Sequence, residues 1–126
     1  WLFVSDHIDA LMLVLSRAKG GSKYCIGGNN EMKNINLVKL ICSILNELRP
    51  TDKSYADLIS FVDDRPGHDL RYSIDFSSIK KDFGWVPKTD INNGIRNTVK
   101  WYMDNRIWCD SVLEKSKYQL DRIGEI

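Results

Sequence analysis

The first twenty residues carry apolar side chains at helical spacing. Positions three and four apart fall on one face of a helix, and here they are Ile8, Leu11, Met12 and Leu15. Leu13 and Val14 widen that face, so we expect the helix to be buried on more than one side. Ser5 or Asp6 is expected to cap it, and the glycine pair at 20–21 to end it.

Three later segments show the same periodicity, and we expect helices over residues 34–48, 76–83 and 91–105. Asn34, Asp75 and Asp90 are the expected caps, because their side chains can accept from the free amides of a first turn. The predicted inward positions are Val38, Ile41, Cys42, Leu45 and Leu48, then Phe76, Ile79 and Phe83, then Ile91, Ile95, Thr98, Val99 and Tyr102.

Short extended runs at 1–4, 23–26, 59–62 and 71–74 are predicted to be strands. The predicted fold class is therefore α+β, a single helix-rich domain over residues 1–126 with a few short strands. The chain opens inside an apolar run without a methionine, so we expect a further segment upstream of it.

Composition excludes several classes of protein. The net charge is only +1, from 18 basic and 17 acidic residues, and no basic cluster typical of a nucleic-acid binder is present. The longest apolar stretch, residues 10–15, is too short to cross a membrane. The three cysteines are scattered, which is typical of buried free thiols in the reducing cytoplasm.

The loop Arg65-Pro66-Gly67-His68-Asp69, continued by Leu70-Arg71-Tyr72, is the sharpest candidate for a binding site. Proline and glycine favour a tight turn, and two guanidinium groups and an imidazole enter it within seven residues. Guanidinium donors match phosphate oxygens, so such a loop suits a diphosphate. A solvated surface turn with local salt bridges explains the same residues equally well.

Two other polar residues are candidates. Asn34 is expected first of all to cap its helix, but a helix N-terminus also favours anions, so its amide can serve a phosphate as well. Tyr118 lies in the less periodic region after 105 and is either a surface aromatic or a side chain that closes over a ligand. For the neighbours Asp6 and His7, a cap and a packed side chain are favoured over an acid/base pair.

The motifs of a complete oxidoreductase are missing from this sequence. No glycine-rich dinucleotide fingerprint follows a strand, no tyrosine has a lysine four residues later, and no cysteine–histidine cluster has metal spacing. The residues alone thus predict a domain that binds a small phosphorylated ligand without its own catalytic groups.

Five segments resemble the C-terminal third of the dTDP-glucose 4,6-dehydratases, within the extended short-chain dehydrogenase/reductase superfamily. They are WLFVSDHIDAL (1–11), YCIGGNNEMKN (24–34), DRPGHDLRYSID (64–75), GWVP (84–87) and GIRNTVKWY (94–102). The likeness runs in order from residue 1 to about 108 and weakly on to 118. Cys25 departs from the asparagine often found there.

The resemblance implies an NAD-dependent lyase that converts dTDP-glucose to dTDP-4-keto-6-deoxyglucose. It assigns NAD and the reacting groups to an N-terminal Rossmann part that this chain lacks, so the chain alone is expected to be inactive. It also implies a homodimer for the full-length enzyme. The contacts to the nucleotide sugar fall by motif on Asn34, Arg65, Pro66, Gly67, His68, Asp69 and Tyr118.

Two other interpretations stay open. The chain can be a non-catalytic binding or scaffold module of the same fold, or the matching domain of a dehydratase or epimerase for another nucleotide sugar. A Rossmann segment encoded upstream in frame would favour the enzyme over the module.

Overall fold

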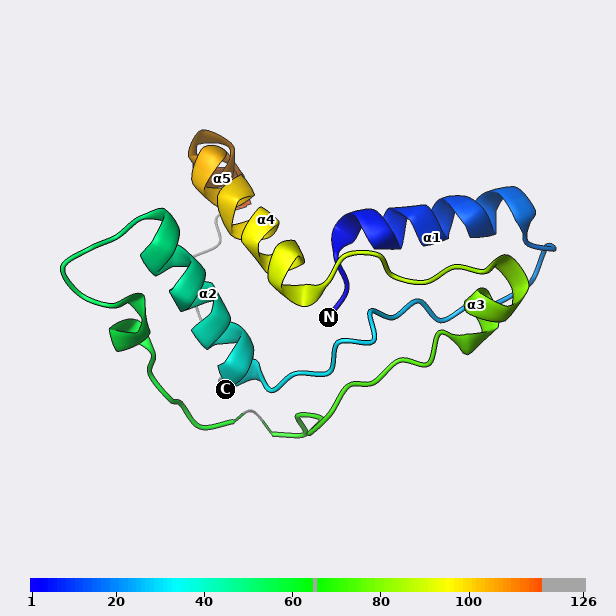
Figure 1. Ribbon diagram of the computed structural model, residues 1–126, viewed down its shortest axis with the longest axis horizontal. Helices are drawn as coiled ribbons and strands as arrows, with labels where there is room; N and C mark the ends of the chain where they lie inside the picture. Colours follow the sequence, from blue (N-terminus) through cyan, green and yellow to red (C-terminus); the bar gives the residue numbers. More distant parts are fainter. Residues whose placement is uncertain (65, 117–126) are drawn as a thin grey trace.

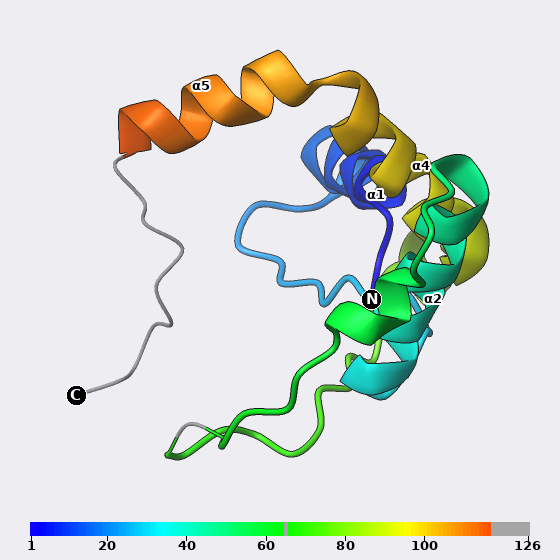
Figure 2. The same ribbon diagram turned by 90° about the vertical axis from the view of Figure 1, so that its left-hand side faces the viewer.

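The computed structural model describes residues 1–64 and 66–116 and is built from helices joined by long extended segments (Figure 1). The helices are α1 (Val4–Arg17), α2 (Asn34–Leu48), the 3₁₀ helix η1 (Tyr55–Leu58), α3 (Ser77–Phe83), α4 (Ile91–Asp104) and α5 (Arg106–Ser116). α1 and α3 lie at one end of the molecule, and α2, η1 and α4 lie at the other. α5 continues from α4 and projects away from the remaining helices (Figure 2).

The predicted strands are absent from the described residues, so the α+β prediction is wrong and the fold is helical there. Residues 1–3, 23–26, 59–62 and 71–74 lie outside helices, but none belongs to a hydrogen-bonded ladder. A strand requires a neighbour that exchanges backbone hydrogen bonds with it. An apolar run of β-forming residues shows that a segment favours an extended conformation. It does not show that a second segment lies beside it to form a sheet.

The face of α1 that is buried differs from the predicted one. Ala10 is fully buried against Ile79 and Trp85, and Leu13 and Val14 pack around this cluster. The predicted inward residues are instead about half exposed or more: Ile8, Leu11, Met12 and Leu15. Periodicity located the helix correctly, but an apolar surface on nearly every side of α1 left the choice of face open.

A second contact joins α2 to α4 at the other end of the molecule. Leu37, Cys42 and Ile44 are buried on α2, and Val99 is buried on α4. The Arg96 guanidinium donates to the Glu47 carboxylate across the two helices. The predicted bounds of α2 are confirmed, whereas Val38 and Tyr102, both predicted inward, are exposed.

Much apolar surface is uncovered. The accessible surface of the chain is 10482 Å², whereas a compact monomer of this mass has about 6900 Å². Large apolar side chains are exposed on α1, α4 and α5. Within the described ranges, no helix has the length and hydropathy that crossing a bilayer would require. These faces are suited to packing against further protein.

The N-terminus of α4 is capped as predicted, and we expect its stability to depend on pH. Asp90 Oδ1 accepts from the backbone N–H of Asn92 at 2.9 Å and of Asn93 at 3.1 Å. The Asn93 backbone bond in particular holds the pKa of Asp90 below its usual range. A carboxyl group whose pKa is lower in the folded state stabilises the fold above its unfolded pKa, and this contribution is lost as the pH falls through the folded pKa.

Asp90→Ala is therefore expected to lower the melting temperature at neutral pH and to have little effect in acid, where the wild-type carboxyl is protonated. Thermal unfolding followed by circular dichroism at both pH values measures this difference. Asp104→Ala, at the opposite end of α4, is the control. A decrease for Asp90→Ala of the same size at both pH values would contradict the assignment.

Candidate functional site

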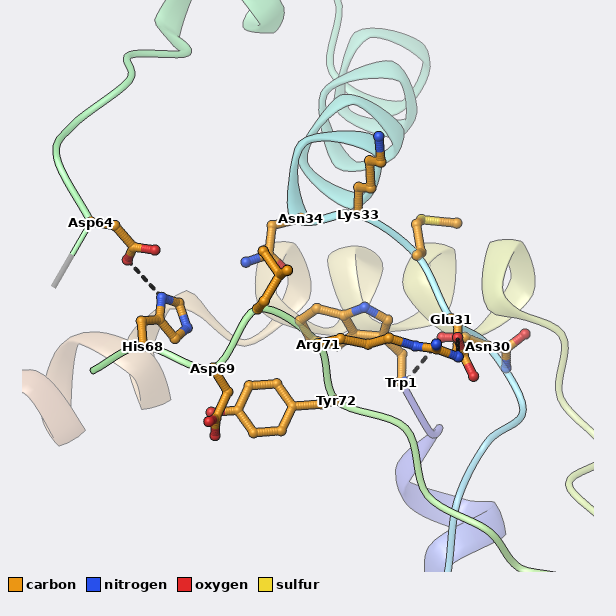
Figure 3. A pocket seen from close by; sticks show the side chains of 12 residues that line it. Trp1, Asn30, Glu31, Lys33, Asn34, Asp64, His68, Asp69, Arg71 and Tyr72 are labelled. Atoms are coloured by element: carbon orange, nitrogen blue, oxygen red, sulfur yellow. Dashed lines mark hydrogen bonds and ion pairs between the residues drawn. The ribbon is translucent and has the colours of Figure 1, made fainter. Parts of the chain in front are cut away.

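A hollow of about 920 Å³ lies between the N-terminal end of α2 and the loop of residues 64–72. Residues 30–34, which lead into α2, form one wall, and Asp64 with residues 68–72 form the other. Trp1 reaches the hollow from the N-terminal segment (Figure 3). Its volume falls within the range of about 300–1,000 Å³ that is usual for sites of small molecules.

Two buried glycines allow three chain segments to meet beside this hollow. A Cβ atom on Gly28 would lie 1.8 Å from the Trp1 carbonyl oxygen, and one on Gly27 would lie 2.9 Å from the Ile74 carbonyl oxygen. Only residues without a side chain permit backbones to approach so closely. Gly27 and Gly28 therefore place residues 30–34 beside both Trp1 and the extended segment that follows the loop.

The N-terminus of α2 faces the hollow, but the predicted cap of this helix is wrong. Lys33, not Asn34, is the N-cap, and no side chain caps the helix. Asn34 is the first residue of α2, so its amide group is available to a ligand at the wall of the hollow. The first turn carries no acidic residue, so the positive end of the helix dipole is not neutralised there.

On the wall opposite α2, Asp64 contacts His68. The His68 Nδ1 and Asp64 Oδ1 atoms are 2.6 Å apart, and the imidazole is 28% exposed. The Asp64 carboxylate accepts, so Nδ1 is the donor in this pair (Figure 3), and Nε2 donates to an anion in the doubly protonated ring. Nε2 then remains as the ring atom that can meet a ligand.

Glu31 joins the two walls. Its carboxylate accepts from the Arg71 guanidinium at 2.5 Å and from the Ser73 hydroxyl at 2.6 Å. The Ser73 hydrogen bond and then the Arg71 hydrogen bond lower the pKa of Glu31. Arg71, one of the two loop guanidinium groups expected to meet a diphosphate, is therefore engaged with a carboxylate.

The structure brings part of the predicted site together. Asn34, His68 and Asp69 line the hollow, whereas Pro66 and Gly67 form the exposed turn beside it, with Gly67 at a φ of 70°. Arg65 and Tyr118 lie outside the described residues. The role of all seven in binding a substrate stays a prediction.

Sequence reasoning missed Glu31 and Ser73. Arg71 and Ser73 are two residues apart on an extended segment, so their side chains lie on the same side of it. That spacing predicts a shared partner but does not identify Glu31, which is 40 residues away from Arg71 in the sequence.

The walls of the hollow carry both charges. Acidic lining residues are Glu31, Asp64 and Asp69, and the basic ones are Lys33 and Arg71, with His68 beside them. In Figure 3 the Lys33 side chain extends along α2, away from the loop. In the part of the chain that the structure describes, no three His, Cys, Asp or Glu side chains form a group that could hold a metal ion.

The sequence model of one protein family, described as GDP-mannose 4,6 dehydratase, matches residues 1–98. The chain belongs to this family. The dTDP-glucose 4,6-dehydratase of Neisseria meningitidis serogroup B is 48% identical over 128 residues, which cover 98% of this chain and 36% of the relative. The dTDP-glucose 4,6-dehydratase 1 of Escherichia coli K12 is 49% identical over 112 residues. These residues cover 89% of this chain and 31% of that relative.

Solved structures of the family agree with the fold. The dTDP-glucose 4,6-dehydratase of Bacillus anthracis, in complex with NAD, is 40% identical with a TM-score of 0.73. The match covers 86% of this chain and 32% of the Bacillus anthracis chain. DesIV of Streptomyces venezuelae, a dTDP-glucose 4,6-dehydratase with NAD and TYD bound, is 34% identical with a TM-score of 0.75. The match covers 86% of this chain and 31% of the DesIV chain.

The resemblance of the sequence to dTDP-glucose 4,6-dehydratases is thus confirmed by relatives and by structures. The chain spans about a third of the length of the curated relatives that it matches.

Proposed function

We propose that this chain is the part of a dTDP-glucose 4,6-dehydratase that holds the nucleoside diphosphate end of the substrate. The observation that carries the proposal is that the uncapped N-terminus of α2 and His68 face one another across the hollow. The relatives are dTDP-glucose 4,6-dehydratases, which supports this reaction for the complete protein, and the hollow is the proposed place of the substrate.

Each wall offers donors to an anion. Free amides and the dipole at the start of α2 favour negative charge, and the Asn34 amide adds a donor. His68 supplies its imidazole, and Arg65 is proposed as a further partner of the diphosphate. Such contacts lie away from the reacting sugar, so they raise catalytic efficiency by positioning the substrate.

NAD is not assigned to this chain. NAD sites of this superfamily need a glycine-rich turn between a strand and a helix, and the sequence has no such fingerprint. We propose that NAD and the reacting groups belong to the two thirds of the family's length that this chain does not span, and that the chain alone is inactive. The exposed apolar helices are proposed to pack against that part, and the complete enzyme to form a homodimer.

In a protein that joins this chain to the rest of the family's length, Asn34→Ala and His68→Gln are each expected to raise the KM for dTDP-glucose about tenfold. Each removes a hydrogen bond to a charged group, and such bonds contribute roughly 1.5–3 kcal/mol. Steady-state kinetics, with the product identified by mass as the substrate less one water, measures the effect.

Matched controls separate this role from general damage. Asn36→Ala removes an exposed asparagine from the same turn of α2, and His7→Gln removes the other histidine, which is exposed on α1. Both are expected to leave KM unchanged. An unchanged KM in Asn34→Ala and His68→Gln would refute the assignment of the hollow to the substrate.

The alternative functions predict other results. A relative acting on another nucleotide sugar would bind UDP- or GDP-sugars more tightly than dTDP-glucose. A scaffold module would bind the nucleotide without converting any nucleotide sugar.

A further inference from the structure

Glu31 lies at the centre of a contact that closes one side of the hollow. Its Oε2 atom accepts from Arg71, and its Oε1 atom accepts from Ser73. Both carboxylate oxygens are therefore used by one extended segment, 40 and 42 residues away in the sequence. Glu31 itself is three residues before α2, so the contact ties the loop directly to the entry of that helix.

We propose that Glu31, Arg71 and Ser73 form a charge-compensated brace, in which Arg71 is a positioning residue and not a ligand of the phosphates. The proposal rests on the proposed function, because it assumes that the hollow holds a nucleoside diphosphate. The brace has two effects: it fixes His68 opposite Asn34, and it cancels a negative charge in the wall of an anion site.

The fixing effect follows from the short connection between the brace and His68. Arg71 is three residues after His68, on the same loop, and Glu31 is three residues before Asn34. A hydrogen-bonded pair between Glu31 and Arg71 thus limits the separation of the two walls. Because Gly27 and Gly28 set the path of the same segment on its other side, residues 28–34 are held from both ends.

The neutralising effect follows from the charges in the hollow. Among the described lining residues, three carboxylates face two cations, Lys33 and Arg71, so these residues alone give a diphosphate no basic excess. The hydrogen bonds from Ser73 and Arg71 lower the pKa of Glu31, so the carboxylate stays ionised and Arg71 is needed to balance it. An unpaired Glu31 would repel the phosphates of the ligand directly.

A double-mutant cycle separates a positioning role from a phosphate contact. In the protein of full family length, Arg71→Gln is expected to weaken binding of dTDP about tenfold, because it leaves Glu31 unpaired in the wall. Glu31→Gln combined with Arg71→Gln is expected to return the Kd to within about threefold of wild type, since the charge and its partner are removed together. Calorimetry with dTDP measures each Kd.

Two further measurements belong to the same experiment. Hydrogen exchange of the amides of residues 67–73 is expected to rise in Arg71→Gln, because the loop loses its anchor. The kcat for dTDP-glucose is expected to stay within about twofold while KM rises. Arg96→Gln breaks another guanidinium–carboxylate pair, between α4 and α2 and away from the hollow, and is expected to leave the Kd unchanged.

Distinct outcomes overturn the brace and the proposed function. A double variant that binds as weakly as Arg71→Gln, while exchange of residues 67–73 stays as in wild type, would show that Arg71 contacts the phosphates and would overturn the brace. So would an Arg71→Gln protein with unchanged Kd and unchanged exchange. A wild-type protein that binds no dTDP would refute the proposed function itself, and in that case raised exchange in Arg71→Gln would still report the link between the loop and α2.

Discussion

Gly28→Ala is expected to destabilise the protein by about 3 kcal/mol or more and to open the hollow, because its new Cβ atom has no space. That atom would lie 1.8 Å from the carbonyl oxygen of Trp1 and 2.8 Å from its carbonyl carbon. Both obstacles are backbone atoms, which cannot turn away as the end of a flexible side chain can. The N-terminal segment and residues 28–34 must therefore move apart.

Urea unfolding followed by circular dichroism measures the loss of stability, and the Kd for dTDP measures the loss of the hollow. Gly20→Ala is the matched control, because a Cβ atom at Gly20 meets nothing within 4 Å and Gly20 has no positive φ. Its expected effect is close to zero or slightly stabilising. Equal stability of the two variants would mean that Trp1 and Gly28 do not cross as described.

The helices could be predicted from the sequence because local signals define them. α2 runs over the predicted residues, Asp90 caps α4 through two backbone amides, and Gly84 ends α3 in the left-handed conformation at a φ of 70°. Each of these features depends on residues within a few positions of one another. The cap at Asp90 and the stop at Gly84 could therefore be predicted without knowledge of the fold, whereas the caps predicted at Asn34 and Asp6 are wrong.

Long-range partners could not be predicted from the same sequence. The strand predictions failed because no segment of the described chain pairs with the extended runs, and the buried face of α1 was missed because apolar residues surround it. The site divides in the same way: the turn at Pro66-Gly67 and the cationic loop were visible, but the engagement of Arg71 by Glu31 depends on a contact across 40 residues. The role of Gly28, which is to admit the backbone of Trp1, likewise depends on a contact that is distant in the sequence.

Asp6 was predicted to make a local contact but makes a long-range one. It was expected to cap α1, but α1 begins at Val4 and Asp6 lies inside its first turn, 4% exposed. Its Oδ2 atom accepts from the backbone N–H of Thr89 at 2.9 Å. Thr89 directly precedes the cap of α4, so one buried carboxylate joins the first helix to the start of the fourth.

Asp6→Ala is accordingly expected to lower the free energy of unfolding by about 2 kcal/mol, since it removes a charge-assisted hydrogen bond and leaves the Thr89 N–H without its acceptor. Asp6→Asn keeps an oxygen at this position without the charge and is expected to cost about half as much. Asp9→Ala is the control on the same helix, because Asp9 is exposed and pairs with Lys88 at 3.4 Å, so its removal is expected to cost less than about 0.5 kcal/mol. Urea titrations of the three variants rank them, and an Asp6→Ala variant as stable as Asp9→Ala would show that the link from α1 to Thr89 contributes nothing to the fold.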